Sequence, residues 1–70
     1  MAYNGWKNWD TWEAHNFLTG HETPYFYVRE LARATDATLK QFEQEAKQFV
    51  PSSVNRRKVD WNEIREAFRG

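Results

Sequence analysis

The chain has 70 residues, and its ten basic and ten acidic side chains leave no formal net charge. Without a basic excess, non-specific binding to nucleic acids or to anionic membranes is not expected. No apolar run approaches the ~18 residues that span a bilayer, and the first residues lack the order of a secretory signal. We therefore expect a cytoplasmic protein with no membrane contact.

Aromatic residues are the main source of stability that the composition offers. The chain has no cysteine, and a domain of this size buries only about 60 % of its unfolded surface. Four Trp, three Tyr and five Phe compensate, because each buried ring removes roughly 150–250 Å² from water. We predict one compact all-α domain over residues 1–70, with a homodimer as the alternative way to bury the rings.

The first stretch, residues 1–9, shows no period and is predicted to be an extended aromatic arm whose Trp6 folds back onto the helices. Asp10 is then expected to cap a first helix of about 11–19, with Glu13 completing a capping box. Gly20 stands where a left-handed residue would end that helix. The apolar spacing of this helix places Trp12 in the core.

The second helix is predicted over about 24–34. Thr23 as N-cap and Pro24 in the first position form a strong start signal, because Pro has no N–H to satisfy there. The apolar run at residues 25–28 also fits a strand, so a two-stranded hairpin is the structural alternative.

The third and fourth helices have the clearest periodicity. Asp36 is expected to cap a helix of about 37–50, and Pro51 ends it. A polar, basic loop follows at 51–59, after which Asp60 caps a helix of about 61–69. Each of the two helices carries one apolar stripe. The stripes consist of Leu39, Phe42, Ala46 and Phe49, and of Trp61, Ile64 and Phe68.

Aromatic residues outside these stripes are the first candidates for function. Exposed rings are typical of surfaces that bind proteins. Trp6 and Trp9 precede the predicted cap, so no helical stripe requires them. The predicted protein-binding residues are Tyr3, Trp6, Trp9, Tyr25 and Tyr27.

The alternative is a nucleic-acid-binding site around the one basic run. Arginine donates two parallel hydrogen bonds to phosphate, and lysine supplies a point charge. Asp60, Glu63 and Glu66 lie nearby and offset part of that potential. The residues of this alternative are Arg56, Arg57 and Lys58 in the loop, with Arg65 and Arg69 on the last helix.

No catalytic, cofactor or metal site is predicted. The two imidazoles, His15 and His21, match no metal-binding spacing, and there is no cysteine ligand. Ser52 and Ser53 lack the context of an activated nucleophile. We therefore expect a protein that is not an enzyme and needs no cofactor.

Two short motifs resemble a known group of proteins. Tyr3-Asn4-Gly5 followed by Asn8-x-x-Thr11-Trp12, and the run Val59-Asp60-Trp61-Asn62-Glu63-Ile64, are similar to a family of short proteins from prokaryotes and their viruses. That family has no assigned activity, so the resemblance implies a small helical fold. With the aromatic surface, it leads us to expect a protein-interaction module of viral or mobile-element origin that acts on an unidentified host protein.

Overall fold

A computed structural model describes residues 3–69, and the predicted all-α fold is confirmed. The elements are α1 (Trp9–Gly20), α2 (Glu22–Arg33), α3 (Leu39–Ala46), the 3₁₀ turn η1 (Lys47–Phe49) and α4 (Trp61–Arg69). The alternative hairpin at residues 25–28 is wrong, because these residues lie inside α2. Residues 1–2 and 70 of the predicted domain lie outside the described residues.

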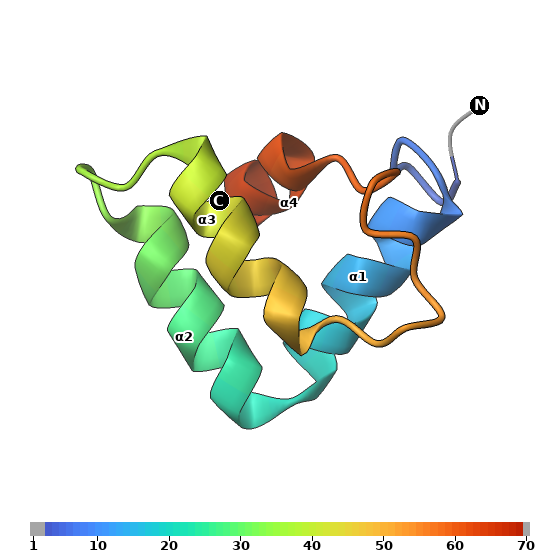
Figure 1. Cartoon of the computed structure of the whole chain (residues 1–70), viewed down its shortest axis with the longest axis horizontal. Coiled ribbons are helices and arrows are strands. Elements are labelled where there is room, and N and C mark those ends of the chain that lie inside the picture. Colours follow the sequence, from blue (N-terminus) through green and yellow to red (C-terminus); the bar gives the residue numbers. More distant parts are fainter. Residues whose placement is uncertain (1–2, 70) are drawn as a thin grey trace.

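The helices form a compact bundle in which α2 and α4 each contact every other α-helix. In Figure 1, α1 and α2 diverge from the turn between them, and α3 runs beside α2. The loop after η1 returns across the molecule to the start of α1. The Cα radius of gyration is 11.0 Å, which is close to the value of about 11 Å expected for a compact chain of this length.

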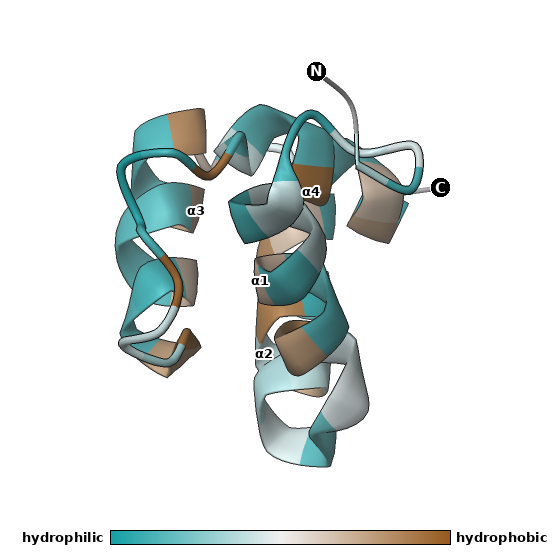
Figure 2. Ribbon diagram, turned by 90° about the vertical axis from the view of Figure 1, so that its right-hand side faces the viewer, coloured by the Kyte–Doolittle hydropathy of each residue, from teal (hydrophilic) through white to brown (hydrophobic). Residues whose placement is uncertain are grey.

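The core draws residues from every α-helix and from the loop before α4. On α4, the predicted stripe is buried in full. On α3, Phe42 and Ala46 are buried, and Leu39 and Phe49 pack against the core from its edge. Figure 2 shows the apolar side of α3 turned toward the other helices and its polar side turned outward. The other buried apolar residues are Ala14, Leu18, Val28, Ala32, Val50, Val54 and Val59.

The segment before α1 differs from the predicted extended arm. Residues 3–6 form a tight turn, in which Tyr3 N–H donates to the Trp6 carbonyl at 2.6 Å and Trp6 N–H donates to the Tyr3 carbonyl at 2.8 Å. Asn4 and Gly5 both adopt positive φ angles, 49° and 86°. Asn-Gly is the pair that favours such a turn, because both residues tolerate the left-handed region. The turn directs the chain back on itself.

The start of α1 is also different. The N-cap is Asn8, whose side chain accepts a hydrogen bond from the Thr11 N–H, so the predicted Asp10 cap is wrong. Asp10 already lies in the first helical turn, where its carboxylate accepts a hydrogen bond from the Asn55 N–H at 2.9 Å. At the other end, Gly20 belongs to the last turn, and the chain leaves α1 through His21 in an extended conformation.

The later helix starts are partly as predicted. α2 begins at Glu22, so Pro24 occupies the third helical position, where its missing N–H also had no partner. α3 is capped by Thr38 rather than Asp36, and Thr38 forms a reciprocal capping box with Gln41. The predicted Thr23 cap is therefore wrong, because Thr23 already lies inside α2, and Asp36 does not cap α3 because it lies in the turn that precedes Thr38.

The cap of α4 is confirmed. Asp60 accepts from the Glu63 N–H at 3.1 Å, and the helix has the predicted bounds. The loop at 51–59 has a polar surface, but Val54 and Val59 are buried and fasten it to the core.

Candidate protein-binding surfaces

Hydrogen bonds centred on Asn8 and Thr11 tie the start of α1 to the segment before α4. The Asn8 Oδ1 atom accepts from both the N–H and the hydroxyl of Thr11, each at 2.8 Å. Its Nδ2 donates to the Lys58 carbonyl at 2.8 Å. The Thr11 hydroxyl oxygen, fully buried, accepts from the Asp60 N–H at 2.9 Å. The two polar residues of the Asn8-x-x-Thr11-Trp12 motif therefore have a structural role, because they connect the start of α1 to the residues just before α4.

The N-terminal rings differ in their contacts, and Trp12 is less buried than we expected. Trp6 is half-buried and packs against the core, with its ring centroid 4.4 Å from that of His15. Trp12, which we expected in the core, is half-buried and lies 5.2 Å from Tyr3. Trp9 and Tyr3 are 38 % and 40 % exposed. Of the predicted binding rings in this stretch, Trp9 and Tyr3 are more exposed than Trp6.

The Trp6 contact continues as a series of rings across three helices. His15 of α1 lies 5.4 Å from Phe68 of α4, and Phe68 lies 5.9 Å from Tyr25 of α2, measured between ring centroids. Tyr25 is consequently half-buried. Burial among these rings lowers the pKa of His15, because desolvation disfavours the charged imidazolium. Trp6 and Tyr25 thus serve mainly as packing residues at the edge of the core.

Tyr27 lies on the other side of α2. Whereas Tyr25 contacts α4, Tyr27 makes an edge contact with Phe49 of η1, with centroids 5.6 Å apart. Its hydroxyl donates to the Glu45 Oε1 atom at 2.5 Å. This hydrogen bond, with smaller contributions from desolvation and from the Glu45 charge, raises the pKa of Tyr27. The ring is nevertheless 41 % exposed, and its neighbour Phe26 is 51 % exposed.

Tyr27 lines two open hollows that share three residues, one on the surface of α2 and one between α2 and α3, and we call the two together the α2–α3 groove. The hollows have volumes of about 390 and 360 Å³, and both are lined by Tyr27, Leu31 and Ala34. These three residues form an apolar floor. The remaining lining residues are Glu30, Asp36, Ala37, Gln41 and Glu45.

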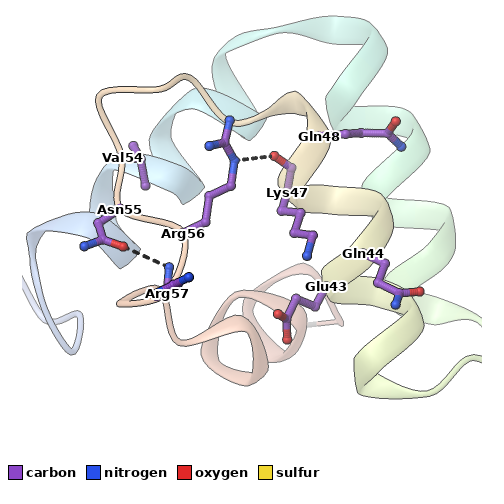
Figure 3. A pocket seen from close by; sticks show the side chains of 8 residues that line it. All are labelled: Glu43, Gln44, Lys47, Gln48, Val54, Asn55, Arg56 and Arg57. Carbon is purple, nitrogen blue, oxygen red and sulfur yellow. Dashed lines mark hydrogen bonds between the residues drawn. The ribbon is translucent and has the colours of Figure 1, made fainter.

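A third hollow, of about 620 Å³, lies between α3 and the loop at 51–59, and we call it the basic hollow. In Figure 3, Lys47 and Glu43 extend from α3 toward the loop that carries Arg57, and Gln44 and Gln48 point away from that loop. Three cationic side chains and one carboxylate line it. The full lining is Glu43, Gln44, Lys47, Gln48, Val54, Asn55, Arg56 and Arg57.

Two of the five predicted nucleic-acid-binding residues donate to helix ends. Arg56 donates from Nε to the Lys47 carbonyl at 3.0 Å and from Nη2 to the Val50 carbonyl at 2.7 Å. Arg69 donates from Nε to the Ala32 carbonyl at 2.6 Å. At both positions a cation lies near the C-terminal end of a helix, where it complements the partial negative charge of the carbonyls.

The other three residues are placed differently. Arg57 and Lys58 are exposed. Arg65 is half-buried, and its Nε atom is buried with no hydrogen-bond partner among residues 3–69. Arg57 joins Arg56 and Lys47 at the basic hollow, whereas Arg69 lies at the far end of α4 from the loop. The structure thus does not gather all five into one patch.

Most of the α2–α3 groove was not predicted from the sequence, although its apolar residues have a helical spacing. Tyr27, Leu31 and Ala34 recur at spacings of four and three residues, which places them on one side of a helix. This second apolar stripe lies beside the one that carries the buried Val28 and Ala32. Lys47 at the basic hollow was also missed, because no motif links it to the loop.

Comparison with known proteins identifies a family. A family of unknown function, DUF7249, matches residues 1–66, and the chain therefore belongs to it. This agrees with the expected membership of a family that has no assigned activity. No curated protein and no solved structure matches the chain. In residues 3–69, none of the helices is long and apolar enough to cross a membrane.

Proposed function

We propose that this protein is a small, non-enzymatic protein-interaction module that binds its partner through the α2–α3 groove. The observation that carries the proposal is the position of Tyr27, a partly exposed ring that lines an apolar depression with Leu31 and Ala34. An exposed tyrosine beside an apolar depression is typical of the residues that dominate protein interfaces. Phe26, next to it in the chain, extends the apolar surface.

The arrangement of Tyr27 also favours binding energetically. Its ring rests against Phe49 and its hydroxyl is bonded to Glu45, so the side chain is already ordered before a partner arrives. Ordering a mobile side chain at an interface costs about 0.5–1.5 kcal/mol. A ring held in advance avoids part of that cost.

The other parts of the sequence-based expectation remain proposals. Tyr3 and Trp9 are the exposed rings of the N-terminal part and would extend the contact surface of a larger partner. The viral or mobile-element origin, the host target and the cytoplasmic location rest on the sequence alone.

Site-specific photocrosslinking in the cell that naturally holds the protein tests the proposal. Benzoylphenylalanine replaces Phe26, which is exposed next to the groove. We expect a discrete protein adduct that disappears when Ala34→Trp fills the floor of the groove. Ala67→Trp is the matched control, because Ala67 is exposed on α4 and lines neither hollow of the groove.

The proposal fails if position 26 gives no adduct, or if Ala34→Trp and Ala67→Trp reduce adduct formation equally. Circular dichroism and thermal unfolding of both variants establish that each is folded. An adduct that consists of two copies of this chain would instead identify the predicted homodimer.

Nucleic-acid binding at the basic hollow is the second candidate. It is favoured by the convergence of Lys47, Arg56 and Arg57 on one hollow. Binding would weaken steeply as salt rises, because each phosphate contact releases counterions. Arg57→Gln should lower the affinity most clearly, since Arg56 also has a structural role. No mobility shift at about 50 mM salt, for duplex or single strand, would rule this candidate out.

A further inference from the structure

The charges that line the α2–α3 groove are all of one sign. Glu30 stands on α2, Glu45 on α3 and Asp36 in the connection between them. Among residues 3–69, no lysine or arginine lines either hollow of the groove. Since the whole chain has no net charge, this local excess of carboxylates arises from where the fold places them.

The end of α2 adds to the negative potential. Ala34, which lines the groove, is the C-cap of α2. The C-terminal end of a helix carries a partial negative charge of roughly half an elementary charge. The groove therefore combines three carboxylates and a helix C-terminus around an apolar floor.

The opposite side of α3 shows that this arrangement is specific to one face. Glu45 and Gln41 of α3 face the α2–α3 groove, whereas Lys47 and Glu43 face the basic hollow. The same helix thus separates a negative groove from a hollow with a cationic excess. A charged partner segment would distinguish between the two by the sign of its charge.

We infer that the partner segment bound in the α2–α3 groove is basic and amphipathic, with an apolar side chain on the floor and lysine or arginine beside it. The inference rests on the proposed function and names the chemistry of the partner. An apolar side chain would contact Tyr27, Leu31 and Ala34, and the flanking cations would face the carboxylates. Acidic segments are disfavoured, because like charges would meet at the rim.

A synthetic probe allows the inference to be tested without knowledge of the natural partner. The probe is a fluorescent peptide of repeated Leu-Lys-Lys-Leu units, and its binding to the full chain is followed by fluorescence anisotropy. Two control peptides keep the pattern but replace all lysines by glutamate, or all leucines by serine. We expect the Leu/Lys peptide to bind more tightly than either control by at least about tenfold, or 1.4 kcal/mol.

Removal of the groove's charges should weaken binding of the Leu/Lys peptide. The triple variant Glu30→Gln, Asp36→Asn, Glu45→Gln keeps the size of each side chain. An exposed ion pair contributes about 0.2–1 kcal/mol, so three of them predict a loss of roughly tenfold.

A second triple variant controls for net charge. It carries the same change in charge at carboxylates outside the groove, Glu13→Gln, Glu22→Gln and Glu43→Gln. We expect its affinity to stay within about twofold of the wild type, because none of these three carboxylates lines the groove. Equal losses in the two triple variants would show non-specific attraction and overturn the inference.

The test separates this inference from the proposed function. If the groove triple variant binds the peptide as tightly as the wild type, or the Leu/Glu peptide binds best, the partner is not basic and the inference fails. The adduct formed by benzoylphenylalanine at position 26 would still support a protein-binding groove. Conversely, loss of that adduct with normal peptide binding would contradict the proposed function alone.

Discussion

The chain has two ring-rich stretches, residues 3–12 and 25–28, and the fold uses them differently. The first is fixed by long-range hydrogen bonds: Asn8 donates to the Lys58 carbonyl, and Thr11 accepts from the Asp60 N–H. The second lies within α2 and divides its rings between the two sides of that helix, Tyr25 toward α4 and Tyr27 toward the groove. A cluster of aromatic residues in the sequence therefore does not show whether they form core or binding surface, because that depends on long-range contacts.

Of the substitutions in the two ring-rich stretches, loss of the Asn8 side chain should lower the free energy of unfolding most. Asn8→Ala removes the N-cap of α1 and the bond to the Lys58 carbonyl, and it leaves the buried Thr11 hydroxyl without its acceptor. A lost cap costs about 1 kcal/mol and a stranded buried polar group about 1–3 kcal/mol. We expect the free energy of unfolding to fall by about 3 kcal/mol, measured by chemical denaturation.

Asn16→Ala is the control for this change, because Asn16 is exposed on the same helix. It should alter the free energy of unfolding by no more than about 0.5 kcal/mol. Equal losses of unfolding free energy in the two variants would contradict a structural role for Asn8. Residues 3–12 would then be a candidate binding surface again.

Truncation of Trp6 should have the next largest effect, and truncation of Trp9 a small one. Trp6 packs against the core from a half-buried position, so Trp6→Ala should cost about 2 kcal/mol, roughly half the value for a fully buried aromatic residue. Trp9 is 38 % exposed, and Trp9→Ala should cost less than about 1 kcal/mol. Chemical denaturation of both variants measures the difference.

Acrylamide quenching provides an independent measurement. Trp9→Phe should remove a more easily quenched part of the fluorescence than Trp6→Phe does, because the Trp9 indole is more exposed. If the Trp6 indole is the more easily quenched, the N-terminal turn does not fold back as described.

Local patterns explain how much of this fold was predictable. The stripes on α3 and α4 repeat within a single helix, and the cap of α4 is a local signal, so their positions followed from the sequence. The position of Trp6 depends on the turn at Asn4-Gly5, which reverses the chain and brings Trp6 onto the core. The Asn-Gly pair is a recognisable turn signal, but no local pattern predicts which helices the flanking rings of Tyr3 and Trp6 contact.

The candidate site was less predictable than the fold. Arg56 and Arg57 are adjacent in the sequence and line the same hollow, yet Arg56 also donates to the carbonyls of Lys47 and Val50. Similarly, the carboxylates of the α2–α3 groove come from α2, α3 and their connection, and no local pattern gathers them. Sites built from several elements require the packing of those elements to be known.

Protonation of His15 should destabilise the protein by a smaller amount than the truncation of Trp6. The folded-state pKa of His15 lies below its ordinary value of 6.5, because its ring is partly buried between Trp6 and Phe68. The unfolded chain therefore takes up the proton first as the pH falls. The stabilising contribution is complete above pH 6.5 and is lost as the pH falls through the folded-state pKa.

The measurement is the melting temperature of the wild type and of His15→Phe from pH 8 to pH 5. The wild type should lose more stability over this interval, because phenylalanine cannot be protonated. If the two melting curves shift in parallel, His15 does not contribute to the pH dependence.

Loss of the Tyr27 hydroxyl should have the smallest effect on stability. The change also tests the contribution of the hydroxyl independently of that of the ring. Tyr27→Phe removes the hydrogen bond to Glu45 on an exposed ring, so its melting temperature at neutral pH should lie only slightly below that of the wild type. The pKa of Tyr27 is raised above 10.0, and its contribution is therefore present below pH 10 and lost as the pH rises through the folded-state pKa. The difference in melting temperature should shrink at alkaline pH, and a difference that grows would contradict the Glu45 contact.

The same residue decides whether the second ring-rich stretch is a binding surface. If the aromatic ring supplies the contact, Tyr27→Phe should bind the Leu/Lys peptide with nearly wild-type affinity, and Tyr27→Ala should lose about tenfold or more. Tyr25→Ala is the matched control, since Tyr25 lies on the opposite side of α2 against Phe68. It should reduce stability more than Tyr27→Ala does and leave peptide affinity unchanged at temperatures where both variants are folded. The reverse result would place the binding surface on the α4 side of α2.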